Sequence, residues 1–250
     1  MQNGNLPHAP GKLIEQVRLH DSHDPHRASS RLSEIILGGQ DGLVNVLGVI
    51  LGVAAATSDP RIVIAAGMAA TFAESVSMGA VAYTSTLAEH DLYHSERERE
   101  RRHIHIAPDV ETHEIREIYR KKGFEGETLD KIVEVITSNP DIWVNVMMTE
   151  EFQMSPPESG HAINTALLVG FSALVGSLIP MLPFFFLEVG LSMWLALAIA
   201  ALTLFVVGAY KARVTVGHPM RSGLQIAVIG TVSALVGYGI GLICKVPTVQ

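Results

Sequence analysis

The sequence predicts an all-α integral membrane protein with five transmembrane helices and a helical domain inserted between the second and the third. Three observations lead to this fold class. Apolar residues make up 48% of the 250-residue chain, and its mean hydropathy is +0.30. Five apolar stretches reach the length of about 20 helical residues that a bilayer core requires. A strongly charged segment, residues 89–159, separates the second stretch from the third.

The predicted spans are rich in glycine as well as in large apolar residues. They cover residues 33–57, 62–87, 162–183, 187–209 and 223–244. Glycines four residues apart recur in the first and the last span, at Gly38/Gly42, Gly48/Gly52 and Gly237/Gly241. This spacing lets membrane helices approach one another closely, whereas so much glycine would weaken a helix in water. We therefore expect tightly packed helices within a membrane.

Loop charges predict the orientation of the spans, because basic residues favour the cytoplasmic side. Lysine and arginine concentrate before the first span, in 89–159 and in the connection 210–221, whereas the loops 58–61 and 182–188 hold one basic residue between them. We therefore expect the N-terminus and residues 91–159 to be cytoplasmic and the C-terminus to lie on the opposite side. The short chain without a sorting tail indicates a bacterial inner membrane.

Four parts follow from this composition: a flexible cytoplasmic tail over 1–30, transmembrane helices 1 and 2 over 31–90, the inserted cytoplasmic helical domain over 91–159, and transmembrane helices 3 to 5 over 160–250. The tail contains no apolar run that would serve as a signal sequence. Its histidines recur at every third position, His20, His23 and His26. A solvated tail explains them more simply than a metal site does.

The inserted domain is predicted to be a small helical bundle. The second span has no stop signal and continues into the alternating Glu and Arg residues before Pro108. A helix over 109–122 would be capped by Asp109 and ended by Gly123, and two more fit 128–138 and 140–152. Alternating charges on such helices are typical of a solvated face.

Charge and cysteine content exclude several classes of protein. Seventeen of the 25 acidic residues lie in 89–159 with nine of the 18 basic residues, so this segment carries a net charge of −8. An acidic domain attracts cations and argues against nucleic acid as a partner. The single cysteine, Cys244, excludes a disulfide within the chain and a cysteine-based zinc site.

Two carboxylates fall inside predicted spans, Asp41 in the first and Glu74 in the second. A charged group in hydrocarbon is costly, so such residues face a cavity or a partner. Met78 lies one helical turn after Glu74, and a carboxylate beside a thioether suits a late first-row divalent metal. Asn45, one turn after Asp41, would add an oxygen. The alternatives are a buried hydrogen bond for the carboxylates and ordinary core packing for the methionine.

Possible metal ligands also recur on the helices of the inserted domain. Glu100 and His103 share one helix face, as do Glu111 and Glu114 on the next helix, and Met147, Met148 and Glu151 lie on the last. Each set alone is more typical of a solvated surface. Three such sets in one small bundle bring carboxylates together, and a cation relieves their repulsion. We therefore expect this domain to bind metal.

The chain resembles the vacuolar iron transporter family over nearly all of its length past Arg31. The resemblance depends on Gly38-Gly-Gln-Asp-Gly-Leu43, on Ala73-Glu-Ser-Val-Ser-Met78-Gly and on a Glu-rich insert that ends in Met147-Met-x-x-Glu151. It implies a homodimer in the lipid bilayer that exchanges Fe²⁺ for protons, with Asp41, Glu74 and Met78 on the translocation pathway.

The resemblance also implies the metal ligands of the insert: Glu100, Glu111, Glu114, Met147, Met148 and Glu151. His103 departs from it, since a second glutamate is expected there, and Glu96 or Glu98 paired with Glu100 is the alternative register. Fe²⁺, or Mn²⁺, Co²⁺ or Zn²⁺, would be the substrate of a secondary transporter, with no permanently bound cofactor and no enzymatic activity. No ATP-binding loop occurs in the sequence, so proton antiport would supply the energy.

Two other functions fit parts of the sequence. A di-iron oxidase needs two Glu-x-x-His motifs, and the chain has one, at Glu100–His103. A membrane-anchored metal sensor would use the insert for binding and the spans as an anchor, which leaves Asp41 and Glu74 without a role.

Overall fold

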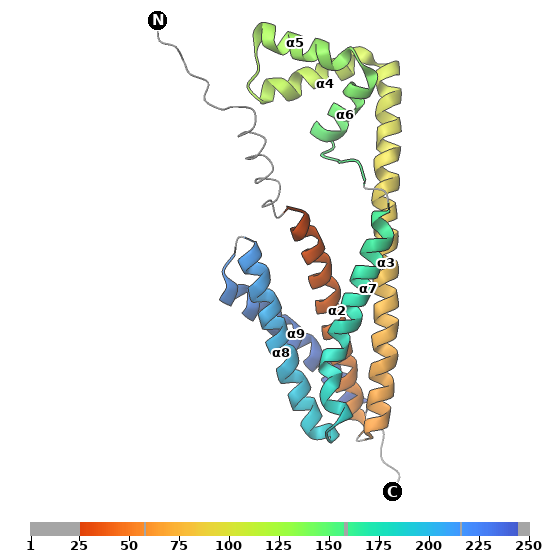
Figure 1. Ribbon diagram of the computed structural model, residues 1–250, viewed down its shortest axis with the longest axis vertical. Coiled ribbons are helices and arrows are strands. Elements are labelled where there is room, and N and C mark those ends of the chain that lie inside the picture. The colour runs from red at the N-terminus through yellow and green to blue at the C-terminus, as the bar shows by residue number, and fades with distance from the viewer. Residues whose placement is uncertain (1–25, 58, 158–159, 216, 245–250) are drawn as a thin grey trace, which may run out of the picture. The chain divides into compact units, whose positions relative to one another are not determined.

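The computed structural model describes residues 26–57, 59–157, 160–215 and 217–244, and every regular element in these ranges is a helix (Figure 1). The elements are α2 (His26–Ala56), α3 (Pro60–Ile106), α4 (Pro108–Lys121), α5 (Gly126–Thr137), α6 (Pro140–Glu150), α7 (His161–Met181), the 3₁₀ helix η1 (Leu182–Phe185), α8 (Val189–Val214) and α9 (Pro219–Ile243). Helix α2 begins inside the expected tail. His20 and His23 lie outside the described residues, as does the side chain of His26.

Five of these helices are long and apolar enough to cross a membrane, as the sequence predicts. They are Leu32–Ala56, Pro60–Ile106, His161–Phe185, Val189–Val214 and Pro219–Ile243. The second is 47 residues long, far more than a span needs. The predicted continuation of this helix beyond the apolar stretch is therefore confirmed.

The chain divides into two compact units. The membrane unit comprises Met1–Gly79 and Leu167–Gln250, and the inserted unit comprises Ala80–Ala166. The divisions fall within α3 and α7, because each of these helices continues from one unit into the other.

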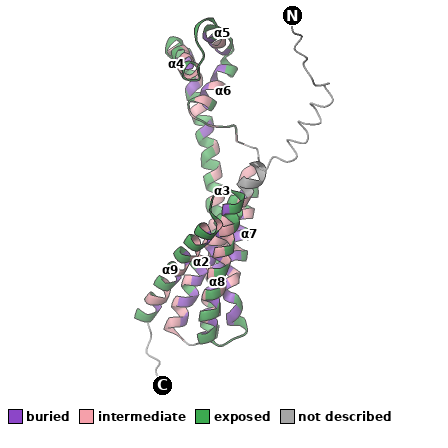
Figure 2. Ribbon diagram, turned by 90° about the vertical axis from the view of Figure 1, so that its left-hand side faces the viewer, coloured by how far each residue is buried: buried purple, intermediate pink, exposed green. Residues whose placement is uncertain are grey.

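Helix α2 contributes more buried residues to the core of the membrane unit than any other helix. Leu43, Val46, Leu47 and Ile50 are fully buried and pack with residues of α3, α8 and α9. On α8 the buried residues recur at nearly every fourth position, and most are small: Ser192, Ala196, Ala200, Leu204, Gly208 and Ala212. Figure 2 shows exposed residues between them. One stripe of α8 thus faces protein, and the rest of this helix is left for lipid.

Glycines bring the backbone of α2 into direct contact with its neighbours. A Cβ added at Gly241 of α9 would lie 1.9 Å from the carbonyl oxygen of Gly52. One added at Gly176 of α7 would lie 2.1 Å from the carbonyl oxygen of Gly39. These distances leave no room for any side chain. Glycine at these positions is therefore a requirement of helix packing.

The inserted unit has a separate apolar core. Residues of the last turns of α3 and of α4, α5 and α6 form it, including Ile104, Ile115, Val133, Trp143 and Val144. The three shorter helices begin within two residues of their predicted starts. Gly123, at φ +95°, follows α4 as predicted, and this left-handed conformation favours glycine.

The prediction that Asp109 caps α4 is wrong. The capping position is Ala107, which makes no side-chain cap, and Pro108 is the first helical residue. Proline suits that position because its fixed φ is helical and it lacks an N–H to satisfy. Asp109 instead lies in the first turn, where its charge interacts favourably with the helix dipole. Asn139 does cap α6, accepting from the backbone N–H of Asp141 at 2.9 Å.

We expect Gly241→Ala to destabilise the membrane unit, because its new methyl group would overlap the backbone of α2. Overpacking of this kind costs roughly 1–3 kcal/mol. Thermal unfolding in detergent measures the effect. Gly239→Ala is the matched control on the same helix, since nothing lies within 4 Å of a Cβ there. Equal unfolding temperatures for the two variants would contradict the close contact.

Candidate metal sites

A turn between α3 and α4 brings three possible metal ligands together in the inserted unit. Glu100 and His103 lie one helical turn apart near the end of α3. The chain then reverses at Ala107, whose carbonyl oxygen accepts from the backbone N–H of Glu111 at 3.3 Å. Glu111 therefore lies in the first turn of α4, next to the last turns of α3.

The three side chains converge on one point. Nδ1 of His103 lies 3.6 Å from Oε1 of Glu100 and 3.6 Å from Oε1 of Glu111. One ligand atom from each residue lies within 4.8 Å of the other two, and among the described residues only this group of three does so. Ligands bound to a transition metal at about 2.1 Å lie roughly 3–4 Å apart. A small inward adjustment would therefore suffice to bind an ion.

Both carboxylates of this cluster are buried. Glu100 is 2% exposed and Glu111 is 5% exposed. Within the described residues, Oε2 of Glu111 has no hydrogen-bond partner. A buried charge without a partner is costly, and a bound cation would remove that cost. A bound cation would give this oxygen a partner, and Glu114, which also interacts with the Glu111 side chain, lies close enough to contribute.

Other carboxylates surround the cluster. Burial raises the pKa of Glu111 to about 7, and the charges of Glu100, Glu114 and Glu151 contribute to the increase. Loss of solvent also raises the pKa of Glu151, with further contributions from Glu114 and Glu100. Glu114 and Glu151 therefore belong to the electrostatic environment of the cluster, and their role as ligands stays a prediction.

The two methionines predicted as ligands lie in the apolar core of the inserted unit. Met147 is 0% and Met148 is 1% exposed, and both belong to the cluster that contains Ile115 and Val144. Their role as ligands stays a prediction. Glu96, from the alternative register, forms an ion pair with Arg99, so its charge already has a partner.

A second group of polar residues lies within the membrane unit. Nδ2 of Asn45 on α2 donates to Oε1 of Glu74 on α3 at 3.0 Å, and the Asp41 carboxyl group interacts directly with Glu74. Among the described residues neither carboxylate forms an ion pair. Met78 follows Glu74 by one turn and is half-buried. A cation bound between the two carboxylates would relieve their mutual repulsion.

Asn45 makes a contact that the sequence does not predict. Its spacing from Asp41 predicts an additional oxygen ligand, which stays a prediction, and its amide nitrogen donates to the carboxylate of Glu74. The i, i+4 spacing correctly places Asn45 on the face of Asp41. Which end of the amide is used depends on the opposing helix.

These features define a class: a helical integral membrane protein with a carboxylate pair inside its spans and an acidic helical unit between the second and third spans. The chain belongs to the VIT family, whose family model matches residues 32–242.

Named relatives cover most of this chain. It is 30% identical over 237 residues to vacuolar iron transporter 1 of Oryza sativa subsp. japonica, an alignment that spans 94% of each chain. It is 32% identical over 212 residues to vacuolar iron transporter 1 of Tulipa gesneriana, covering 84% of this chain and 86% of the relative. The vacuolar iron transporter of Plasmodium falciparum is 28% identical over 224 residues, covering 86% of this chain and 82% of the relative.

The burial of Glu111 makes the stability of the metal-free inserted unit depend on pH. The folded chain holds this proton up to about pH 7, whereas the group ordinarily loses it near 4.5. The unfolded chain therefore binds fewer protons in that window, and stability falls as the pH rises through it. We expect Glu111→Gln, which stays neutral, to remove most of this loss.

The fluorescence of buried Trp143 during thermal unfolding reports on this unit, in a Trp194→Phe background that removes the other tryptophan. Glu134→Gln is the control, because Glu134 is exposed on α5. If the unfolding temperature of Glu111→Gln depended on pH in the same way as that of the control, Glu111 would not be the source of the pH dependence.

His103 should influence which metal the cluster prefers. Imidazole nitrogen suits zinc, nickel and iron, whereas carboxylate oxygen suits manganese. We expect His103→Glu to strengthen binding of Mn²⁺ relative to Zn²⁺, measured by competition on purified metal-free protein. The ratio cancels the general effect of one more negative charge. An unchanged ratio, equal to that of the control His105→Glu on the same helix, would exclude His103 from the site.

Proposed function

We propose that this protein moves ferrous iron out of the cytoplasm in exchange for protons. The observation that carries the proposal is the pair Asp41 and Glu74, which interact within the spans and have no cationic partner among the described residues. Ionisable residues inside membrane spans are rare, and where they pair with one another they mark the pathways of ions. The names of the relatives, all vacuolar iron transporters, support metal transport.

The proposed cycle uses the carboxylates as alternating sites for metal and protons. Fe²⁺, or Mn²⁺, Co²⁺ or Zn²⁺, would reach Asp41, Glu74 and Met78 and displace the proton that they hold. A proton from the other side would later displace the metal, because metal and proton compete for the same oxygens. Asn45 would keep Glu74 oriented throughout the exchange.

Proton coupling answers an energetic requirement. Moving a divalent ion out against an inside-negative potential costs about 4.6 kcal/mol per 100 mV. Protons that return in the opposite direction offset this cost. We propose a secondary active transporter with no enzymatic activity, in a bacterial inner membrane and as a homodimer.

In this proposal the inserted unit is cytoplasmic and captures the metal before transport. Its buried cluster Glu100, His103 and Glu111 supplies one nitrogen and two oxygen donors. The net charge of −8 over residues 89–159 raises the local concentration of cations. Glu114, Glu151, Met147 and Met148 complete the proposed ligand set.

The alternative function is that of a metal sensor. It is favoured because the cluster of Glu100, His103 and Glu111 lies entirely within the inserted unit. In a sensor the inserted unit would bind metal and the spans would carry no flux. A di-iron oxidase has less support, because the chain contains a single Glu-x-x-His motif. Flux distinguishes the transporter from both.

We expect anaerobic Fe²⁺ flux into proteoliposomes to follow an imposed pH gradient and to be lost in Asp41→Asn. Asp59→Asn is the matched control, because Asp59 is an exposed carboxylate beside the loop before α3. Iron binding by purified Asp41→Asn should be retained in the inserted unit. Binding without flux in the wild-type protein would instead support the sensor.

A further inference from the structure

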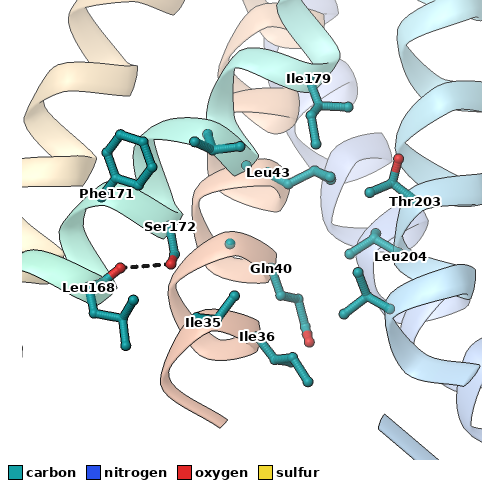
Figure 3. Close-up of a pocket in the computed structure, with 14 residues that line it drawn as sticks. Ile35, Ile36, Gln40, Leu43, Leu168, Phe171, Ser172, Ile179, Thr203 and Leu204 are labelled. Carbon is teal, nitrogen blue, oxygen red and sulfur yellow. Dashed lines mark hydrogen bonds between the residues drawn. The ribbon is translucent and has the colours of Figure 1, made fainter. Parts of the chain in front are cut away.

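A long apolar cavity lies within the membrane unit between α2, α7 and α8 (Figure 3). Its volume is about 430 Å³, and it extends along α2 from Ile35 to Leu43. Eight residues of helix correspond to about 12 Å, and one leaflet of a bilayer core is about 15 Å deep. The first span predicted from the sequence begins at residue 33, so we expect the cavity to lie within the leaflet in which that span begins.

Two glycines bring the α2 and α7 walls of the cavity into contact. Gly39 and Gly176 touch through their backbones and supply no side chains to fill the space. Phe171 and Val175 on α7 line the cavity and are exposed at its rim. The cavity therefore opens outward between membrane-spanning helices, where hydrocarbon chains surround a protein.

One polar group in the cavity has no hydrogen-bond partner among the described residues. The hydroxyl of Ser172 donates to the carbonyl oxygen of Leu168 at 2.7 Å, and that of Thr203 donates to Ile199 at 2.8 Å. The Gln40 amide extends from α2 toward α8 (Figure 3) and forms no hydrogen bond with any described residue. A ligand with an apolar body and a hydrogen-bonding group at one end would satisfy both kinds of lining.

The cation of Lys211 lies beside the part of α2 where the first span begins. A second, smaller cavity of about 160 Å³ shares Ile36 and Gln40 with the first and is also lined by Lys211 and Thr215 at the end of α8. A ligand in the large cavity that continued past Gln40 would therefore reach the ammonium group of Lys211.

Lys211 has no carboxylate partner within the described part of the chain. Neither Lys211 nor its neighbours Arg213 and Arg221 form an ion pair with a described residue. In the inserted unit, by contrast, six of the nine basic residues pair with carboxylates, as Arg116 does with Asp130 at 2.5 Å. The basic residues at this end of the spans are thus available for an anion from outside the chain.

We propose that an anionic phospholipid binds here, with one acyl chain in the large cavity, its ester region at Gln40 and its phosphate at Lys211. The apolar cavity, the Gln40 amide that both cavities share and the Lys211 cation on the smaller cavity are the three kinds of partner that the chain, ester and phosphate of a phospholipid need. A zwitterionic lipid would fill the cavity equally well but would gain less from Lys211, because its headgroup carries its own cation.

Native mass spectrometry of the purified protein after incubation with phosphatidylglycerol or phosphatidylcholine vesicles tests this proposal. We expect retention of phosphatidylglycerol in preference to phosphatidylcholine. Lys211→Gln should reduce retention of phosphatidylglycerol about fivefold, the effect of one basic residue near an anionic surface. Arg221→Gln, an exposed cation that lines neither cavity, is the control for charge.

A second pair of variants tests the cavity itself. Val207 lines it and Val206, the next residue of α8, is exposed and does not. Val207→Phe should abolish retention and Val206→Phe should leave it unchanged. Equal retention of both lipids by all variants would mean nonspecific annular lipid and would overturn the proposal. A dimer that Val207→Phe alone dissociates would overturn it too, because a second copy of the chain would then cover this face.

Discussion

Backbone contact between α2 and its neighbours is the constraint on which the rest of the membrane unit depends. Lipid is as apolar as leucine, so membrane helices gain little from burying apolar side chains and depend on close packing instead. Gly52 and Gly241 let α2 meet α9, and Gly39 and Gly176 let it meet α7. Dispersion between surfaces this close is small for each atom pair and large in sum.

The same helix positions the polar residues inside the spans. Asp41, Asn45, Gly48 and Gly52 follow i, i+4, i+7 and i+11 and therefore lie on one face of α2. Gly48 and Gly52 on that face contact the backbone of α9. Asn45, which precedes them, donates a hydrogen bond to Glu74 of α3. The packing that holds the helix also sets the position of the carboxylates, so a change at the glycines would disturb both.

Stability and function make opposite demands on the inserted unit. Its apolar core holds α4, α5 and α6 against the last turns of α3. Beside this core, Glu100 and Glu111 are buried near His103, and Oε2 of Glu111 has no hydrogen-bond partner among the described residues. Burying carboxylates together weakens the metal-free fold. That cost is the reason why a cation would bind there, since its binding energy includes the relief of the repulsion.

The sequence alone determined the five spans, the helical insert and the helix faces that carry the polar residues. Hydropathy, glycine spacing and charge are properties of single helices, so they can be read without knowing which helices meet. Only the tertiary structure decided that Glu111 reaches Glu100 and His103, that the Asn45 amide donates to Glu74, and that Pro108 begins α4 in place of a cap by Asp109. It also placed Met147 and Met148 in the apolar core. The physical reason is that these contacts depend on how side chains from separate helices pack, and periodicity along one helix carries no information about its partner.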